Sequence, residues 1–118
     1  MSRPDWDTYF LLIAEAVSKR ASCPRASVGA VLVSPDHRIL ATGYNGAPKG
    51  NRECLTYGCT VVDDHCQTAV HAEVNAVGYA ARFGVPIEGA KLYMFDTGNR
   101  PEPCRECRKV LLAAGVRW

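Results

Sequence analysis

The chain has 118 residues, which is enough for one domain and too few for two. Hydrophobic residues make up 47% of it and charged residues 22%, a globular composition that excludes a disordered chain. The formal net charge of +2 gives no sign of nucleic-acid binding, and no apolar run approaches the roughly 20 residues of a membrane span. Asp5 and Asp7 interrupt the start of the chain, so we expect no signal peptide and a cytoplasmic location.

Six cysteines and three histidines are a large supply of soft metal ligands for so short a chain. Thiols stay reduced in the cytoplasm, so we interpret the cysteines as metal ligands or free thiols rather than as disulfides.

A helix is predicted at the start of the chain, where apolar residues recur at helical spacing between Asp5 and Arg20. Either Asp5 or Asp7 can cap this helix, and Ser22-Cys23-Pro24 ends it. Two β-rich runs follow, from Val28 to Val33 and from Ile39 to Tyr44, and the turn residues between them predict an antiparallel hairpin.

The stretch from Gly46 to Gln67 has no clear hydrophobic period, and we interpret it as a long ordered loop that has a function or binds a metal. A second helix is predicted from Ala69 to Phe83, a third strand from Lys91 to Phe95 and a third helix from Cys104 to Ala114. Val116 to Trp118 is typical of the opening of a fourth strand. This order of elements predicts a three-layer α/β/α sandwich with a mixed central sheet.

Two short motifs carry the chemistry, His71-Ala72-Glu73 and Pro103-Cys104-Arg105-Glu106-Cys107, and each opens a predicted helix. Cys104 and Cys107 are three residues apart, so both sulfurs can face one point on a helical turn. Helix N-termini also favour thiolates. With His71 they make three protein ligands, which leaves the fourth position of a tetrahedral zinc for water, as in catalytic sites.

Glu73 lies two residues from His71, so we place it beside the metal rather than on it. Zinc lowers the pKa of a bound water towards about 7, and a carboxylate beside it can take the proton and return it to the ring nitrogen and the leaving amine. The alternative is that both residues are incidental and the CxxC is a redox or structural pair. HxE followed by PCxxC is the signature of zinc deaminases, which favours zinc.

Further motifs extend the pattern over nearly the whole chain: Cys23-Pro24-Arg25, Val28-Gly29-Ala30, Thr42 to Pro48, Cys54, Gly58-Cys59, His65-Cys66, Val70 to Ala76, and Gly89 to Tyr93. On these residues the chain resembles the deoxycytidylate (dCMP) deaminase family of the zinc-dependent cytidine deaminase-like superfamily. The resemblance implies that superfamily's fold, hydrolytic loss of ammonia from dCMP to give dUMP, an oligomer (a dimer or a hexamer) and, in some members, regulation by dCTP and dTTP.

The resemblance also implies roles outside the zinc motifs. Asn45 matches a residue that contacts the substrate sugar in relatives, although Asn45-Gly46 is also typical of a simple turn. Ala72 and Glu73 would frame the base. Cations that suit a 5′-phosphate or an effector phosphate, each also compatible with a solvated surface charge, are Arg25, Lys49, Arg52 and Arg82.

A second, structural zinc is suggested by five further soft ligands: Cys23, Cys54, Cys59, His65 and Cys66. Family members with such a zinc use the positions that match Cys23 and Cys54, and the other three residues would supply the remaining ligands. The alternative is that the cysteines are buried free thiols.

The chain departs from the family in three places. The loop from Asp96 to Glu102 is several residues longer than the usual link into PCxxC, and because it borders the active site it bears on substrate choice. The stretch from Cys107 to Leu111 is similar to cytidine and blasticidin deaminases. Relatives continue into further sheet beyond Trp118, so we expect the C-terminal strands to be truncated here or completed by another subunit.

We therefore predict a single zinc-dependent deaminase domain over residues 1–118, acting on dCMP. The first alternative is the same chemistry on another cytosine or adenine substrate, either a free nucleoside or a base in single-stranded nucleic acid, although the near-neutral charge argues against a polymer. The second alternative is a non-catalytic zinc-binding scaffold. Glu73 argues against the scaffold, because a purely structural site needs no such carboxylate.

Overall fold

The computed structural model describes residues 2–22, 26–47, 61–62, 65–66 and 70–118. Its helices are α1 (Trp6–Ser18), α3 (Ala72–Phe83) and α4 (Arg105–Ala113). Its strands are β1 (Val28–Val33), β2 (Ile39–Tyr44), β3 (Val61–Val62), β4 (His65–Cys66) and β5 (Lys91–Asp96). No helix in these described ranges is long and apolar enough to cross a bilayer.

The predicted elements are confirmed, with the ends of the first helix, the third strand and the third helix shifted by one or two residues and with two larger differences. The second helix begins at Ala72 rather than Ala69, and His71 is its N-cap. The stretch predicted as a loop contains β3 and β4, which pair with each other in antiparallel fashion. Asp5 rather than Asp7 caps α1, because its side chain accepts the backbone N–H of Thr8 at 2.8 Å.

The three long strands form one sheet in the order β2-β1-β5. β1 lies in the middle and is antiparallel to both neighbours, so that β1 and β2 make the predicted hairpin. β5 pairs with β1 from Asp96 opposite Val28 to Lys91 opposite Val33. The three named strands are therefore all antiparallel, and the predicted mixed sheet is represented only by one isolated parallel bridge between Arg117 and Lys91, where the fourth strand is predicted to open.

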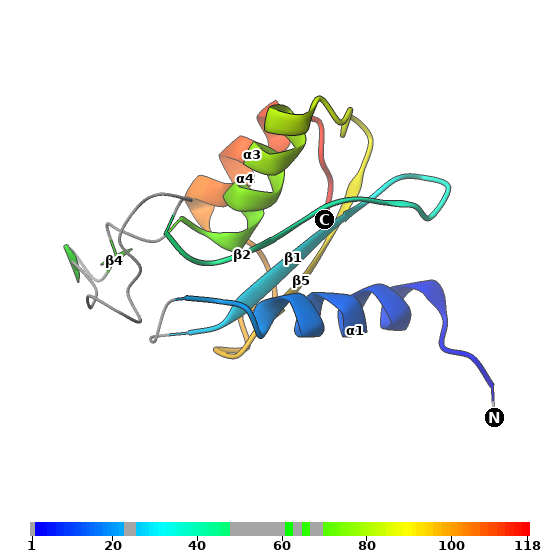
Figure 1. The fold of residues 1–118 in the computed structure, drawn as a ribbon, viewed down its shortest axis with the longest axis horizontal. Coiled ribbons are helices and arrows are strands. Elements are labelled where there is room, and N and C mark those ends of the chain that lie inside the picture. The colour runs from blue at the N-terminus through cyan, green and yellow to red at the C-terminus, as the bar shows by residue number, and fades with distance from the viewer. Residues whose placement is uncertain (1, 23–25, 48–60, 63–64, 67–69) are drawn as a thin grey trace.

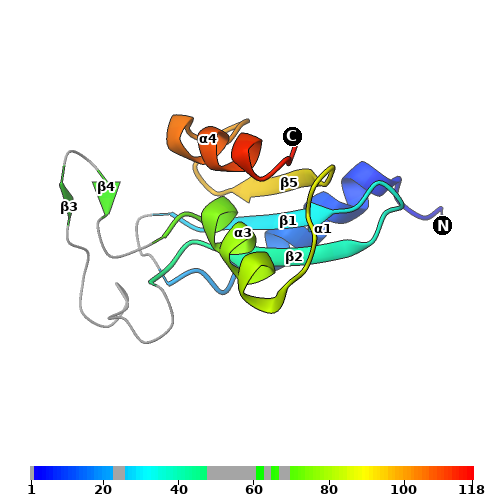
Figure 2. The ribbon, with the colours of Figure 1, turned by 90° about the horizontal axis from the view of Figure 1, so that it is seen from above.

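Helices cover both faces of this sheet and make the predicted three layers (Figures 1 and 2). α1 lies on one face, and α3 and α4 lie on the other. Alternate residues of β1 face the two sides: Val31 and Val33 pack with Phe10 of α1, whereas Ala30 and Leu32 belong to the core under α3 and α4. Every residue of β1 is buried, which explains why this strand is almost purely apolar.

Two glycines let the helices approach the strands closely. A Cβ on Gly29 would lie closer than 3.0 Å to the backbone of Ala14 in α1, and a Cβ on Gly43 would also lie closer than 3.0 Å to the carbonyl oxygen of Ala72 in α3. The first turn of α3 therefore rests directly on the backbone of β2. This seating fixes the height of residues 71–73 above the sheet.

One end of the sheet gathers the segments that lead into α3 and α4. Reciprocal backbone hydrogen bonds between Gly46 and Val70, 3.1 and 2.7 Å long, tie the end of β2 to the approach to α3. Asn75 of α3 donates to the carbonyl of Tyr44 at 2.8 Å. β5 ends at Asp96 on the same side, so the loop into α4 also starts there.

Replacing Gly43 with alanine is expected to destabilise the protein by about 1–3 kcal/mol, because the new methyl group overlaps backbone atoms of α3 that cannot move alone. Urea denaturation measures the change in the free energy of unfolding. Gly78→Ala is the matched control. Gly78 is exposed in α3, and a Cβ added there would meet nothing within 4 Å, so alanine is expected to raise the free energy of unfolding by about 0.5–1 kcal/mol. Equal effects of the two substitutions would contradict this account.

Candidate functional site

The three predicted zinc ligands converge at the N-termini of α3 and α4. His71 is the N-cap of α3 and Cys104 is the N-cap of α4, and neither side chain caps its own helix. Residues at the N-cap and three positions later lie close enough to meet in a capping box, and the same spacing here brings Cys107 beside Cys104. Arg108 donates its Nε to the carbonyl of Pro103 at 2.9 Å, which fixes the residue before Cys104.

The ligand atoms form a compact triangle. Nδ1 of His71 lies 3.2 Å from Sγ of Cys107 and 3.4 Å from Sγ of Cys104, and all three atoms lie within 4.8 Å of one another. Tetrahedral zinc, with bonds of about 2.0 Å to nitrogen and 2.3 Å to sulfur, requires ligand atoms about 3.5 Å apart. One zinc ion therefore fits these three atoms and keeps a fourth position for another ligand.

Glu73 lies beside this triangle and is fully buried. Among the described residues, neither of its carboxylate oxygens has a hydrogen-bond partner. Buried polar atoms in native proteins almost always have a partner, because burial without one is strongly unfavourable. The carboxylate therefore has room for a partner that the described residues do not supply, such as water or a bound molecule.

The electrostatics of the triangle also favour a cation. Burial raises the pKa of the Cys107 thiol well above its usual range, and the adjacent carboxylate of Glu73 and then the side chain of Cys104 raise it further. Such a thiol stays protonated unless a cation stabilises its thiolate, and zinc binds cysteine in that form. The donor set, the distances and the charges thus agree on zinc.

The loop between β5 and α4 brings a positive charge to the edge of the site. Asp96 is buried at the end of β5, and its carboxylate accepts Nε of Arg100 at 2.6 Å. Burial works to lower the pKa of Arg100, but the hydrogen bond and charge of Asp96, followed by the charges of Glu73 and Cys104, raise it overall. Arg100 therefore lies within electrostatic reach of the predicted catalytic residues.

Sequence reasoning identified this loop but missed both Asp96 and Arg100 as individual residues of the site. A signal was present, because an aspartate at the end of a strand precedes an arginine by four positions, and the arginine lies three residues before PCxxC. That spacing allows a short loop to close on an ion pair.

The predicted substrate-binding residues have different surroundings. Asn45 is buried, its Oδ1 accepts the N–H of Val28 and its Nδ2 donates to the carbonyl of Ala26, each at 2.8 Å. Its side chain thus fastens the segment before β1 to the end of β2. Ala72 is buried in the first turn of α3, and Arg25 lies outside the described residues.

The predicted second zinc falls largely outside the part of the chain that the structure describes. Cys23, Cys54 and Cys59 lie in the ranges that are left out. His65 and Cys66 form β4, of which the backbone alone is described. A structural zinc on these residues stays a prediction.

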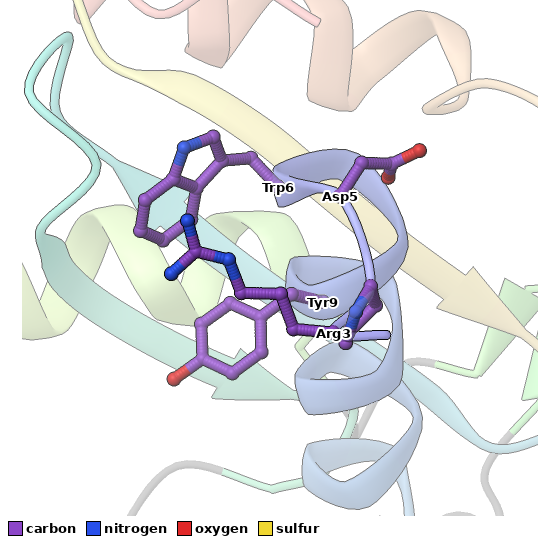
Figure 3. A pocket seen from close by; sticks show the side chains of 5 residues that line it. Arg3, Asp5, Trp6 and Tyr9 are labelled. Atoms are coloured by element: carbon purple, nitrogen blue, oxygen red, sulfur yellow. The ribbon is translucent and has the colours of Figure 1, made fainter. Parts of the chain in front are cut away.

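Two hollows can be compared as candidate sites. A cavity of about 320 Å³ lies between the starts of α3 and α4 and is lined in part by all three ligands. A cavity of about 610 Å³ lies at the N-terminal end of α1, where the rings of Trp6 and Tyr9 flank the side chain of Arg3 (Figure 3). Trp6 stacks on His37 in the hairpin turn, 4.3 Å between ring centroids, so this second cavity lies at the opposite end of the sheet from the ligands.

Comparisons with known proteins agree with this geometry. Residues 4–118 match the family model described as the cytidine and deoxycytidylate deaminase zinc-binding region. The chain is 40% identical over 117 residues to ComE operon protein 2 of Bacillus subtilis, covering 99% of this chain and 59% of that protein. It is 42% identical over 127 residues to the deoxycytidylate deaminase of Mycobacterium phage D29, covering 98% of this chain and 93% of that protein.

A solved structure shows the same fold. The dCMP deaminase from the cyanophage S-TIM5, in complex with dCMP and dUMP, superposes with a TM-score of 0.77 at 31% sequence identity. The match covers 98% of this chain and 79% of that one. This chain therefore spans less than two thirds of the Bacillus subtilis relative, but most of the two phage proteins.

After dialysis, the Cys107→Ser protein is expected to contain less zinc than the wild-type protein, by one ion per chain. The substitution removes one of the three ligands of the triangle. Elemental analysis by mass spectrometry measures the zinc content. Glu73→Gln is the matched control and should keep the wild-type content, since Glu73 lies beside the triangle and not in it. Equal zinc in the wild-type and Cys107→Ser proteins would contradict the assignment of the ligands.

Proposed function

This chain belongs to the family of cytidine and deoxycytidylate deaminases that share this zinc-binding region, and we propose that it hydrolyses a cytosine nucleotide, converting dCMP and water to dUMP and ammonia. The phage D29 deoxycytidylate deaminase and the cyanophage enzyme solved with dCMP and dUMP support this substrate. The observation that carries the proposal is the buried carboxylate of Glu73, which has no described partner and lies beside three metal ligands. The proposal takes residues 1–118 as one deaminase domain that acts in the cytoplasm.

In the proposed reaction, His71, Cys104 and Cys107 hold zinc, which when bound acidifies a water molecule and so provides a nucleophile at neutral pH. Glu73 carries the protons. Its carboxylate takes a proton from the attacking water and delivers it to the ring nitrogen of cytosine. It then takes the proton of the hydroxyl group that the water has left on C4 and passes it to the amino group, so that the C4–N bond breaks, ammonia leaves and the carbonyl of uracil forms. Since no described residue bonds either oxygen, both are available for this exchange.

The same observation argues against a non-catalytic scaffold. A structural zinc site is closed by four protein ligands, whereas the described residues offer three around this point. A scaffold would also gain nothing from a buried carboxylate without a partner, because such a group lowers stability.

The proposed substrate contacts follow from the same end of the sheet. After its two bonds to backbone, Asn45 keeps one amide hydrogen and one oxygen lone pair, which supports a contact with the sugar. The first turn of α3 at Ala72 is proposed to frame the base, and Arg25 to contact the phosphate. Assembly into a dimer or hexamer is likewise proposed from the resemblance. Regulation by dCTP and dTTP is proposed from the resemblance alone.

Ammonia release from a panel of dCMP, CMP, deoxycytidine, dCTP and a cytosine-containing single strand tests the proposal. We expect efficient turnover of dCMP, and we expect Glu73→Gln to lower kcat by about 10²–10⁴-fold because the proton carrier is lost. The zinc content of this variant, measured in parallel, separates loss of proton transfer from loss of metal. If another compound of the panel is turned over more efficiently than dCMP, that compound is the substrate and dCMP is not. No turnover by zinc-loaded wild-type protein would contradict the enzymatic assignment.

A further inference from the structure

The first half of the loop between β5 and α4 is tied down at its base. Ser27 donates its backbone N–H to Oγ1 of Thr97 at 2.9 Å, and Thr97 donates its own N–H back to the carbonyl of Ser27 at 3.0 Å. Asp96 accepts the N–H of Gly98 on Oδ1 at 2.7 Å. These bonds fix the loop to the segment before β1, on the side of the sheet where the metal ligands converge.

Asp96 uses its other oxygen to orient Arg100. The Oδ2–Nε distance is 2.6 Å, and the Asp96 side chain is only 3% exposed, so the carboxylate is shielded from water and gives the guanidinium a defined direction. The bond occupies Nε and leaves both terminal nitrogens of the guanidinium without a hydrogen-bond acceptor among the described residues. The Arg100 side chain is 38% exposed, so a molecule entering from solvent can reach it.

We propose that Arg100 is a specificity-determining residue that binds the phosphate of the nucleotide substrate, so that the site selects a cytosine nucleoside monophosphate over the free nucleoside. The inference rests on the proposed function and adds that the substrate phosphate is the group that Arg100 recognises. Two parallel N–H donors on a planar guanidinium match the oxygens of phosphate better than a lysine does. Arg100 lies four residues before the ligand Cys104, in the loop whose start is bonded to Ser27 and whose end is bonded to Arg108.

Electrostatics support this position. After the hydrogen bond and charge of Asp96, the negative charges of Glu73 and Cys104 also raise the pKa of Arg100, so the guanidinium lies within the electrostatic reach of the site. Asp96 holds the guanidinium of Arg100 in one direction through their 2.6 Å ion pair. Asp96 is in this sense a positioning residue.

A simpler role for Arg100 is to balance the negative charge of Glu73 and the ligand thiolates. The two roles differ in what they predict. Charge balance acts on every substrate and product alike, whereas phosphate recognition acts only on those that carry a phosphate.

Isothermal titration calorimetry with dUMP and with deoxyuridine separates the two roles and does not depend on turnover. Arg100→Ala is expected to weaken dUMP binding by about 10–100-fold, because one charge-assisted contact is lost, and to leave deoxyuridine within about three-fold of wild type. Arg100→Lys keeps the charge without the fork and should fall in between. Asp96→Asn should shift dUMP binding in the same direction by less, since it loosens the guanidinium.

Arg38→Ala is the matched control, because Arg38 lies next to the hairpin turn at the other end of the sheet and should change neither affinity. Steady-state kinetics on dCMP should show the Arg100→Ala effect in KM, with kcat within about three-fold of wild type. Three results would overturn the inference: unchanged dUMP binding, equal weakening of dUMP and deoxyuridine, or a wild-type protein that does not prefer dUMP. If the preference for dUMP depends on Arg100 while no cytosine compound is turned over, the inference stands and the proposed reaction fails.

Discussion

The seating of α3 on β2 at Gly43 is the constraint on which the rest of the site depends. Any side chain at Gly43 would push the carbonyl of Ala72 away from the sheet, and its neighbours His71 and Glu73 would move with it. Asn75 also fixes the first turn of α3, because its side chain donates a hydrogen bond to the carbonyl of Tyr44. Because metal ligands and proton carriers must be placed to within about half an ångström, the height of one helix above one strand controls the chemistry.

Local patterns explain how much of the fold could be predicted from the sequence. β1 and β2 were predicted with the bounds that the structure has, since each is a short β-rich run next to turn residues. The start of α3 was predicted three residues early, because histidine is an unusual N-cap and nothing in the sequence marks His71 as a boundary. β3 and β4 were missed, since strands of two residues have no period to detect.

The zinc ligands could be predicted from local sequence motifs, whereas the other residues of the site depend on contacts that the motifs do not encode. The metal ligands come in two local motifs, and each needs only the start of a helix to place its side chains. The side-chain bonds of Asn45 instead reach backbone atoms 17 and 19 residues away, and local spacing does not encode such contacts. The pair of Asp96 and Arg100 is close in sequence, but its value depends on the burial of Asp96, which only the packed sheet provides.

The hydrogen bonds at the two ends of the β5–α4 loop bear on how sites of this kind diversify. Thr97 is bound to Ser27 at one end, and the carbonyl of Pro103 is bound to Arg108 at the other. The residues between these anchors can change in number and identity without displacing Cys104, because the strain of an insertion ends at the anchors. The sequence of this loop can therefore vary during evolution and alter substrate preference, while the zinc ligands and their chemistry stay the same.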